Sequence, residues 1–140
     1  ILLVEDNPDD RDLALHAFEQ ARIPSRVDVC EDGQEALDYL FGDGRFMGAG
    51  KPAMPELILL DLKLPKIDGI EVLRKIRTNA VICRLPVVIL TSSREESDLI
   101  ACYNHHANSY VRKPVDFLQF VEAARQLGLY WLTLNEAAPN

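Results

Sequence analysis

The sequence predicts an α/β domain built on a doubly wound, five-stranded parallel sheet, the flavodoxin-like arrangement. Two observations predict it. Short runs at 1–4, 57–60 and 87–90 are apolar at every position, which is typical of strands buried on both faces. Segments with apolar residues at helical spacing separate these runs, so strands alternate with helices. Right-handed crossovers then place helices on both faces of the sheet.

The elements follow from the pattern in chain order. Residues 27–31 alternate apolar and polar side chains, as an edge strand with one wet face does, and 109–111 form a brief strand that stops at Lys113-Pro114. Because the first, third and fourth strands are apolar throughout and the second is an edge, the predicted strand order is 2-1-3-4-5. Helical spacing covers the segments 13–21, 36–40, 70–76, 99–103 and 117–127.

Length and charge limit the function. The 140 residues make one domain, since domains have about 100–200 residues. The net charge is −7, and residues 1–43 carry 12 acidic and 3 basic side chains. Nucleic acid and anionic membrane surfaces are poor partners for this distribution, because binding to phosphates depends on Lys and Arg. A hard cation or a basic protein surface fits better.

The cysteines indicate a reducing compartment. Cys30, Cys83 and Cys102 are odd in number, far apart and without a CxxC pair, so we expect free thiols and a cytoplasmic location. No apolar stretch reaches the ~20 residues of a membrane helix.

Chemically active side chains follow the predicted strands. Glu5 and Asp6 come after the first strand, Asp61 after the third, Thr91 after the fourth and Lys113 after the fifth. Taken one by one, these residues are better explained as turn, capping or solvated residues. In an open parallel sheet, however, the carboxyl ends of the strands form one functional crevice, so we expect these side chains to meet.

Three carboxylates in one crevice repel each other unless a cation neutralises them. Oxygen ligands from few protein groups suit Mg²⁺, with Mn²⁺ as an alternative. A carboxylate beside such a metal can attack a phosphoryl group in line. The sequence therefore predicts an aspartyl phosphate.

Four segments in this order resemble the signature of the response-regulator receiver domain of two-component systems. They are Ile1-Leu2-Leu3-Val4-Glu5-Asp6-Asn7, Leu59-Leu60-Asp61-Leu62-Lys63-Leu64-Pro65 with Asp68-Gly69, Pro86-Val87-Val88-Ile89-Leu90-Thr91, and Lys113-Pro114. The resemblance covers 1–129, which implies a receiver domain there and a C-terminal extension at 130–140. We expect no output domain after it.

The resemblance implies a role for each metal-site residue. Asp61 would be the phospho-acceptor, supplied by the phosphohistidine of a sensor histidine kinase or a phosphotransfer protein. Asp6 and Asp61 would bind Mg²⁺ directly, Glu5 would complete the acidic pocket, and the backbone carbonyl of Lys63 would join the metal shell. Such a protein is not an enzyme for another substrate, because it catalyses only its own phosphorylation and dephosphorylation.

The resemblance also implies a switch. Thr91 and Lys113 would bind phosphoryl oxygens, and the peptide bond before Pro114 would be cis, an isomer that proline makes accessible. Tyr110 stands at the place of the switch aromatic, whose rotamer would follow Thr91; an ordinary core aromatic is the alternative. The change would be read on the fourth helix, fifth strand and fifth helix.

Three further features are similar to the stand-alone response regulators of bacterial phytochrome-type histidine kinases. They are the long loop at 42–56, the His105-His106 pair and the end Leu129-Tyr130-Trp131-Leu132. The loop is either a surface insertion or a partner contact. The apolar tail either extends the fifth helix and packs within the chain, or joins that helix in a homodimer contact.

Three other functions are alternatives to the receiver. A phosphohydrolase of this sheet class places an acid two residues after its nucleophile, where this chain has Lys63. A flavin-binding module is disfavoured because the acidic segment 5–10 has the wrong charge for a phosphate. A receiver-like scaffold that is never phosphorylated stays open, and an assay with acetyl phosphate and Mg²⁺ separates it from a working receiver.

Overall fold

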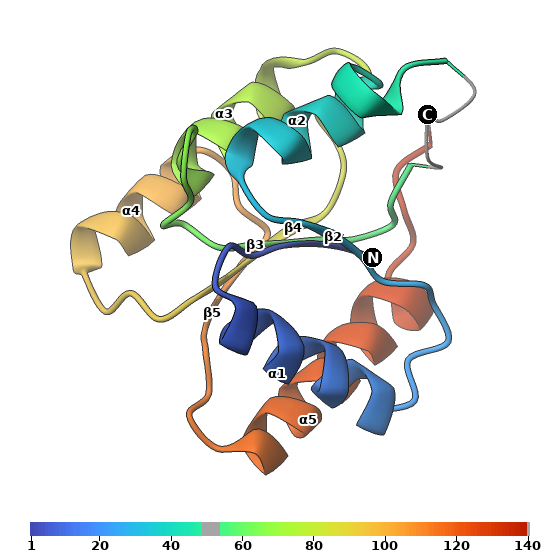
Figure 1. Cartoon of the computed structure of the whole chain (residues 1–140), viewed down its shortest axis with the longest axis vertical. Helices are drawn as coiled ribbons and strands as arrows, with labels where there is room; N and C mark the ends of the chain where they lie inside the picture. The colour runs from blue at the N-terminus through green and yellow to red at the C-terminus, as the bar shows by residue number, and fades with distance from the viewer. Residues whose placement is uncertain (49–53, 140) are drawn as a thin grey trace.

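The computed structural model describes residues 1–48 and 54–139. Its centre is a five-stranded parallel sheet in the order β2-β1-β3-β4-β5, which confirms the predicted fold class and strand order. Helices α1 and α5 cover one face of the sheet, and α2, α3 and α4 cover the other (Figure 1). The strands are β1 (Leu2–Val4), β2 (Asp28–Cys30), β3 (Ile58–Leu60), β4 (Val87–Thr91) and β5 (Ser109–Arg112).

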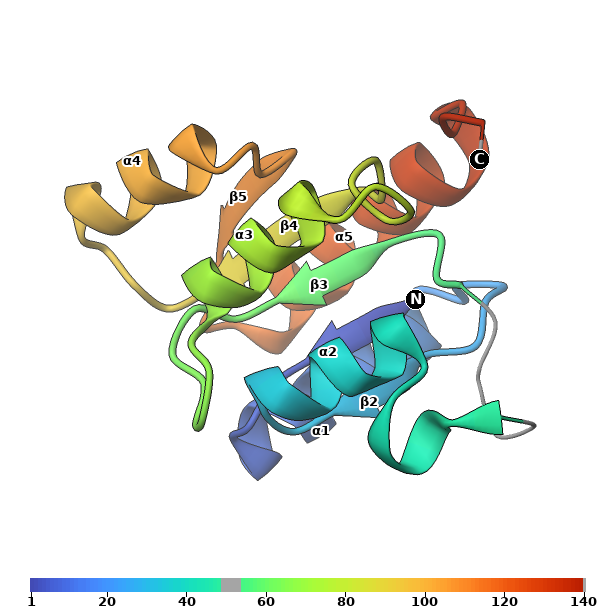
Figure 2. The same ribbon diagram turned by 90° about the horizontal axis from the view of Figure 1, so that it is seen from above.

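Two apolar cores form because successive residues of a strand point to opposite faces of the sheet. Leu2 and Val4 belong to the core under α2, α3 and α4, whereas Leu3 belongs to the core under α1 and α5. Figure 2 shows the three-helix layer in front of the sheet. The helices are α1 (Pro8–Gln20), α2 (Gly33–Phe41), α3 (Gly69–Thr78), α4 (Glu96–Asn104) and α5 (Phe117–Gly128).

The interior and edge strands differ in burial as their sequences predict. Every residue of β1, β3 and β4 is buried, because each of these strands has a neighbour on both sides and helices on both faces. The edge strands β2 and β5 contain half-buried residues. The continuous apolar runs therefore mark the interior of the sheet.

Side-chain caps fix the loops that leave the sheet at its functional edge. The Asn7 side chain accepts hydrogen bonds from the backbone N–H groups of Asp9 and Asp10, which starts α1 directly after the acidic pair that follows β1. The Asp68 side chain accepts from the backbone N–H of Glu71 and starts α3. Such caps stabilise a helix by about 1 kcal/mol each.

The C-terminal segment continues α5. A π-helical turn, η3 (Leu129–Leu134), follows the helix directly, and Trp131 and Leu132 pack against the core under α1 and α5. Leu129, Tyr130 and Leu134 are exposed. The tail thus packs partly within the chain and leaves apolar groups at the surface.

The long α2–β3 connection is described only in part. It contains a short 3₁₀ turn, η1 (Gly44–Phe46), whose Phe46 ring meets the ring of Tyr39 edge-on at a centroid distance of 5.2 Å. The centre of the predicted 42–56 loop, residues 49–53, lies outside the described residues. None of the described helices is long and apolar enough to cross a membrane.

Candidate functional site

Four strands end at one edge of the sheet and bring the predicted site together. The Asp61 backbone N–H donates to the Val4 carbonyl over 3.1 Å, so the residue after β3 lies beside the end of β1. The Lys113 backbone N–H donates to the Thr91 carbonyl over 2.8 Å, which joins the ends of β5 and β4. These backbone bonds place the side chains that follow each strand around one crevice.

Glu5, Asp6 and Asp61 form a carboxylate cluster at this edge. Each side chain offers one oxygen, and these three atoms lie within 4.8 Å of one another. Glu5 and Asp61 are buried, and Asp6 is open to solvent. Oxygen ligands with one open side fit a hard divalent cation that keeps several water ligands. The donor set therefore fits Mg²⁺.

Lys113 supplies the positive charge of the site. Its Nζ donates to Asp61 Oδ2 over 3.1 Å, to Asp10 Oδ2 over 3.0 Å and to Glu5 Oε1. Only 10% of the side chain is exposed. Burial opposes charge on the ammonium, but the hydrogen bond to Glu5 and the charges of Asp61 and Glu5 outweigh it and raise the pKa of Lys113. The group stays charged at any physiological pH.

Burial weakens the acidity of the Glu5 carboxyl group. Desolvation raises its pKa to about 7, and the nearby charge of Asp61 acts in the same direction, whereas the hydrogen bond from Lys113 opposes both. Its second oxygen accepts from the Asn7 backbone N–H over 3.3 Å. Deprotonated Glu5 is the form that a cation requires, so metal binding and proton release at this site are linked.

Thr91 and Tyr110 are connected through Ser93. Thr91 is only 1% exposed, and its hydroxyl accepts from the Ser93 backbone N–H over 3.3 Å. The half-buried Tyr110 donates its hydroxyl proton to the Ser93 carbonyl over 3.3 Å. The two residues predicted to form a switch are therefore tied to the same short segment after β4.

The segment after Asp61 turns back on itself. Asp61 Oδ1 accepts from the Leu62 backbone N–H over 2.7 Å, and the Gly69 backbone N–H donates to the Leu62 carbonyl over 2.8 Å. The Lys63 side chain is exposed. The backbone carbonyl of Lys63 accepts no hydrogen bond from any residue the structure describes. That carbonyl is thus available for the predicted metal contact.

The predicted cis bond before Pro114 is wrong for this structure. The described residues contain no cis peptide bond, so Lys113 and Pro114 are joined in the trans form. Trans is the more stable isomer of such a bond by about 0.5–1 kcal/mol, and from it Lys113 reaches the carboxylates of Glu5, Asp10 and Asp61.

Two contacts of the site were not predicted from the sequence. One is Asp10, whose carboxylate shares the Lys113 ammonium. Its place in the first turn of the helix that follows Glu5 and Asp6 was the available signal. The other is the hydrogen bond from Ser93 Oγ to Asp98 Oδ2, 2.6 Å, which joins the segment after β4 to the first turn of α4. No sequence motif predicts the contact between Ser93 and Asp98.

The family model described as the response regulator receiver domain matches residues 1–125. The chain belongs to the response-regulator receiver family. Receiver domains serve phosphorylation-based two-component signalling and bind Mg²⁺ at an acidic pocket. The Glu5, Asp6 and Asp61 cluster gives this receiver an acidic pocket.

Two relatives resemble this receiver over nearly its whole length. The probable methanogenesis regulatory protein FilR2 of Methanothrix harundinacea is 40% identical over 98% of this chain and 86% of its own. The response regulator Rcp1 of Synechocystis sp. is 37% identical over 94% of this chain and 88% of its own. Its Mn²⁺-bound crystal structure superposes with a TM-score of 0.87 and covers 99% of this chain and 97% of its own.

A crystal structure of the phosphorylated cyanobacterial phytochrome response regulator RcpA is also similar. It superposes with a TM-score of 0.89 at 36% identity and covers 99% of this receiver and 96% of its own chain. The likeness to Rcp1 and RcpA confirms the predicted similarity to response regulators of the phytochrome type.

Proposed function

We propose that this receiver accepts a phosphoryl group on Asp61 from the phosphohistidine of a sensor kinase or phosphotransfer protein. The observation that carries the proposal is the Lys113 ammonium, which lies 3.1 Å from Asp61 Oδ2 beside the carboxylate cluster. An Asp61 oxygen forms the new O–P bond while the P–N bond to histidine breaks, and its electron pair returns to the imidazole nitrogen.

Each neighbouring residue has a part in this transfer. Asp6, Asp61, Glu5 and the Lys63 carbonyl would hold Mg²⁺, which neutralises negative charge on the phosphoryl oxygens when bound. Lys113 and the Thr91 hydroxyl would each bind a phosphoryl oxygen. The protein then catalyses its own phosphorylation and dephosphorylation and no reaction of a separate substrate.

The switch would pass through the segment after β4. A phosphoryl group adds about −1.5 to −2 charge and three acceptor oxygens. When the Thr91 hydroxyl turns toward them, the shared contact at Ser93 carries the change to Tyr110. The surface of α4, β5 and α5 would report it to a partner protein.

The kinase partner we propose is a phytochrome-type histidine kinase in the cytoplasm. The likeness to RcpA, described as a phytochrome response regulator, supports the kinase class. The three free cysteines suit a reducing compartment. Within the chain, residues 1–129 would form the receiver and 130–140 an extension that contributes to contacts.

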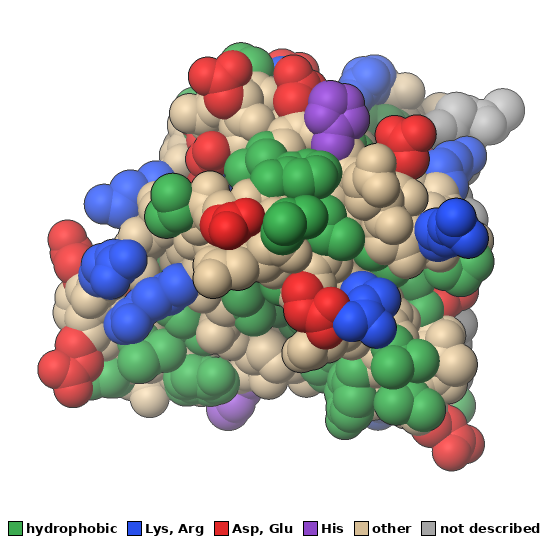
Figure 3. Space-filling view, turned by 90° about the horizontal axis from the view of Figure 1, so that it is seen from below, with side chains coloured by type: hydrophobic (Ala, Val, Ile, Leu, Met, Phe, Trp, Pro, Cys, Tyr) green, Lys and Arg blue, Asp and Glu red, His purple; other side chains and the backbone are tan. Residues whose placement is uncertain are grey.

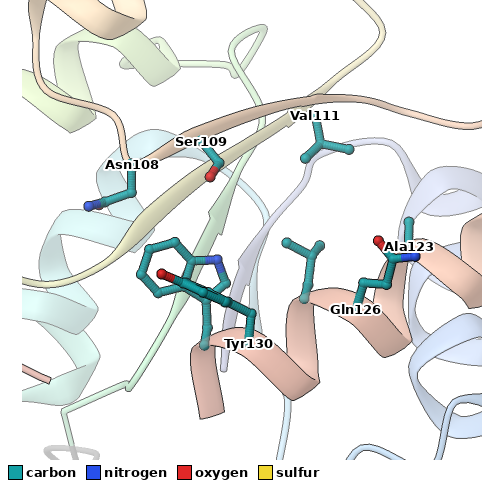
Figure 4. A pocket seen from close by; sticks show the side chains of 8 residues that line it. Asn108, Ser109, Val111, Ala123, Gln126 and Tyr130 are labelled. Atoms are coloured by element: carbon teal, nitrogen blue, oxygen red, sulfur yellow. The ribbon is translucent and has the colours of Figure 1, made fainter. Parts of the chain in front are cut away.

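We further propose a homodimer through α4, β5, α5 and the tail. A pocket of about 500 Å³ lies between β5, α5 and the tail, and Figure 4 shows Ser109 and Val111 on one side of it and Ala123, Gln126 and Tyr130 on the other. Leu118 is 74% exposed on α5. Sedimentation velocity of the full chain would show a dimer that Tyr130→Glu weakens; a monomer at every concentration contradicts it.

Transfer from an autophosphorylated bacterial phytochrome kinase tests the proposed function. With Mg²⁺ present, the label should leave the kinase and appear on the wild-type receiver, whereas Asp61→Asn should stay unlabelled. If the wild-type chain takes no label from the kinase and none from acetyl phosphate, the scaffold function replaces the proposed one.

A further inference from the structure

Asp10 places a fourth carboxylate at the site. Its Oδ2 lies 3.0 Å from Lys113 Nζ, no farther than Asp61 Oδ2 at 3.1 Å. The position of Asp10 is fixed, because its own backbone N–H donates to the Asn7 side chain in the first turn of α1. The Asp10 side chain is 40% exposed, compared with 10% for Asp61.

All hydrogen-bond donors of the Lys113 ammonium are in use in this arrangement. A lysine ammonium has three N–H donors and no acceptor, and here Glu5, Asp10 and Asp61 accept from it. A phosphoryl oxygen can therefore bind Nζ only after one carboxylate gives up its bond. Breaking the bond to Asp10 costs the least free energy, because water can replace the ammonium at this more exposed carboxylate.

We propose that Asp10 is a positioning residue that holds Lys113 in the unphosphorylated arrangement and opposes phosphorylation of Asp61. The inference rests on the proposed function. Two effects act in the same direction: Asp10 competes with the phosphoryl oxygens for Lys113, and its negative charge lies near the added charge of the phosphoryl group. Removal of the Asp10 charge then speeds the phosphorylation of Asp61 and lengthens the lifetime of the phosphorylated state.

The chain offers a matched control in Asp9. It lies in the same first turn of α1 and carries the same charge near the helix N-terminus. It is exposed, and within the ranges 1–48 and 54–139 it forms no ion pair. Asp9→Asn and Asp10→Asn therefore change the net charge and the helix terminus alike, and only the second frees a donor of Lys113.

Intact-mass time courses with acetyl phosphate at saturating Mg²⁺ test the inference. We expect Asp10→Asn to be phosphorylated about two- to fivefold faster than Asp9→Asn, the factor that corresponds to the energy of a partly exposed ion pair. It should also keep its phosphoryl group longer by a similar factor. Asp10→Glu restores the charge and should not accelerate the reaction.

Two results separate the possible failures. Equal rates and lifetimes for the Asn variants of Asp9 and Asp10, in a chain whose wild type is phosphorylated, overturn the role of Asp10. A purely structural role would lower the unfolding temperature of Asp10→Asn without changing either rate. Absence of any phosphate on the wild type would instead refute the proposed function itself.

Discussion

Lys113 Nζ lies 3.1 Å from Asp61 Oδ2, although 52 positions separate the two residues in the chain. They follow β5 and β3, which are not neighbours, because β4 lies between them. Their contact depends on the parallel arrangement of all three strands, whose carboxyl ends meet at one edge. Any change that disturbs the sheet edge therefore affects the charge balance of the site.

Removal of the Lys113 charge should destabilise the metal-free protein strongly. Lys113→Ala leaves Glu5 and Asp61 buried without their counter-charge, and breaking such a buried pair costs about 3 kcal/mol or more. Urea denaturation in EDTA measures the loss, and added Mg²⁺ should restore part of it.

A surface lysine provides the comparison for that experiment. Lys66 pairs with Asp32 at 3.4 Å but is 67% exposed, so Lys66→Ala should cost below about 1 kcal/mol. Equal losses for the two lysine variants would show that the Lys113 ion pairs contribute no more than a surface pair.

Metal binding should depend on Asp6. Mg²⁺ stabilises the wild type because it binds the folded state only, and a concentration a hundred times the dissociation constant adds about 2.7 kcal/mol. Asp6→Asn removes the solvent-facing carboxylate of the cluster and should abolish most of this gain. Asp12→Asn, on the exposed side of α1, should leave it unchanged. An undiminished Mg²⁺ effect on the Asp6 variant would place the metal elsewhere.

As the pH rises, the metal-free wild type should lose stability relative to the metal-free Glu5→Gln variant. Burial raises the Glu5 pKa from 4.5 to about 7 in the folded state. The folded chain then binds a proton that the unfolded chain has released, so the stabilisation is complete below pH 4.5 and is lost as the pH rises through 7. Denaturation curves in EDTA across this range measure it; a pH-independent difference between the two proteins contradicts it.

Gly69 should be hard to replace because it packs against the backbone that carries Asp61. A Cβ at this position would lie 2.1 Å from the Asp61 carbonyl oxygen and 2.7 Å from Leu62 Cα. Gly69→Ala must therefore move that backbone, and we expect a loss of about 1–3 kcal/mol together with slower phosphorylation.

A second glycine controls for the added methyl group. At Gly128 the added Cβ would meet Ile23 Cδ1 at 2.2 Å, the end of a flexible side chain that can turn away. Gly128→Ala should therefore cost less stability than Gly69→Ala and leave the phosphorylation rate unchanged. The reverse order would indicate that the Asp61 backbone adapts easily.

Sequence predicted the sheet well because burial on both faces leaves a direct trace. The runs at 1–4, 57–60 and 87–90 became β1, β3 and β4, and the alternating 27–31 became the edge strand β2. The site residues were found for a related reason: the end of each apolar run marks the functional edge. Their convergence follows from topology alone.

Contacts that depend on side-chain geometry were not predictable in this way. The Asp10 bond to Lys113 needs the exact start of α1, and the Ser93 bond to Asp98 needs the turn after β4. The isomer of the bond before Pro114 depends on a small energy difference that local sequence does not determine. Figure 3 shows both charged and hydrophobic groups on the side of α1 and α5, so the types of side chain at that surface do not identify a partner.

The central claim is that Asp61 is the phospho-acceptor. Incubation with acetyl phosphate and Mg²⁺, followed by intact mass and peptide mapping, tests it most directly. The wild type should gain the mass of one phosphoryl group on the peptide that contains Asp61, and EDTA or Asp61→Asn should prevent the gain. No added mass on the wild type, or an undiminished gain on Asp61→Asn, would contradict the claim.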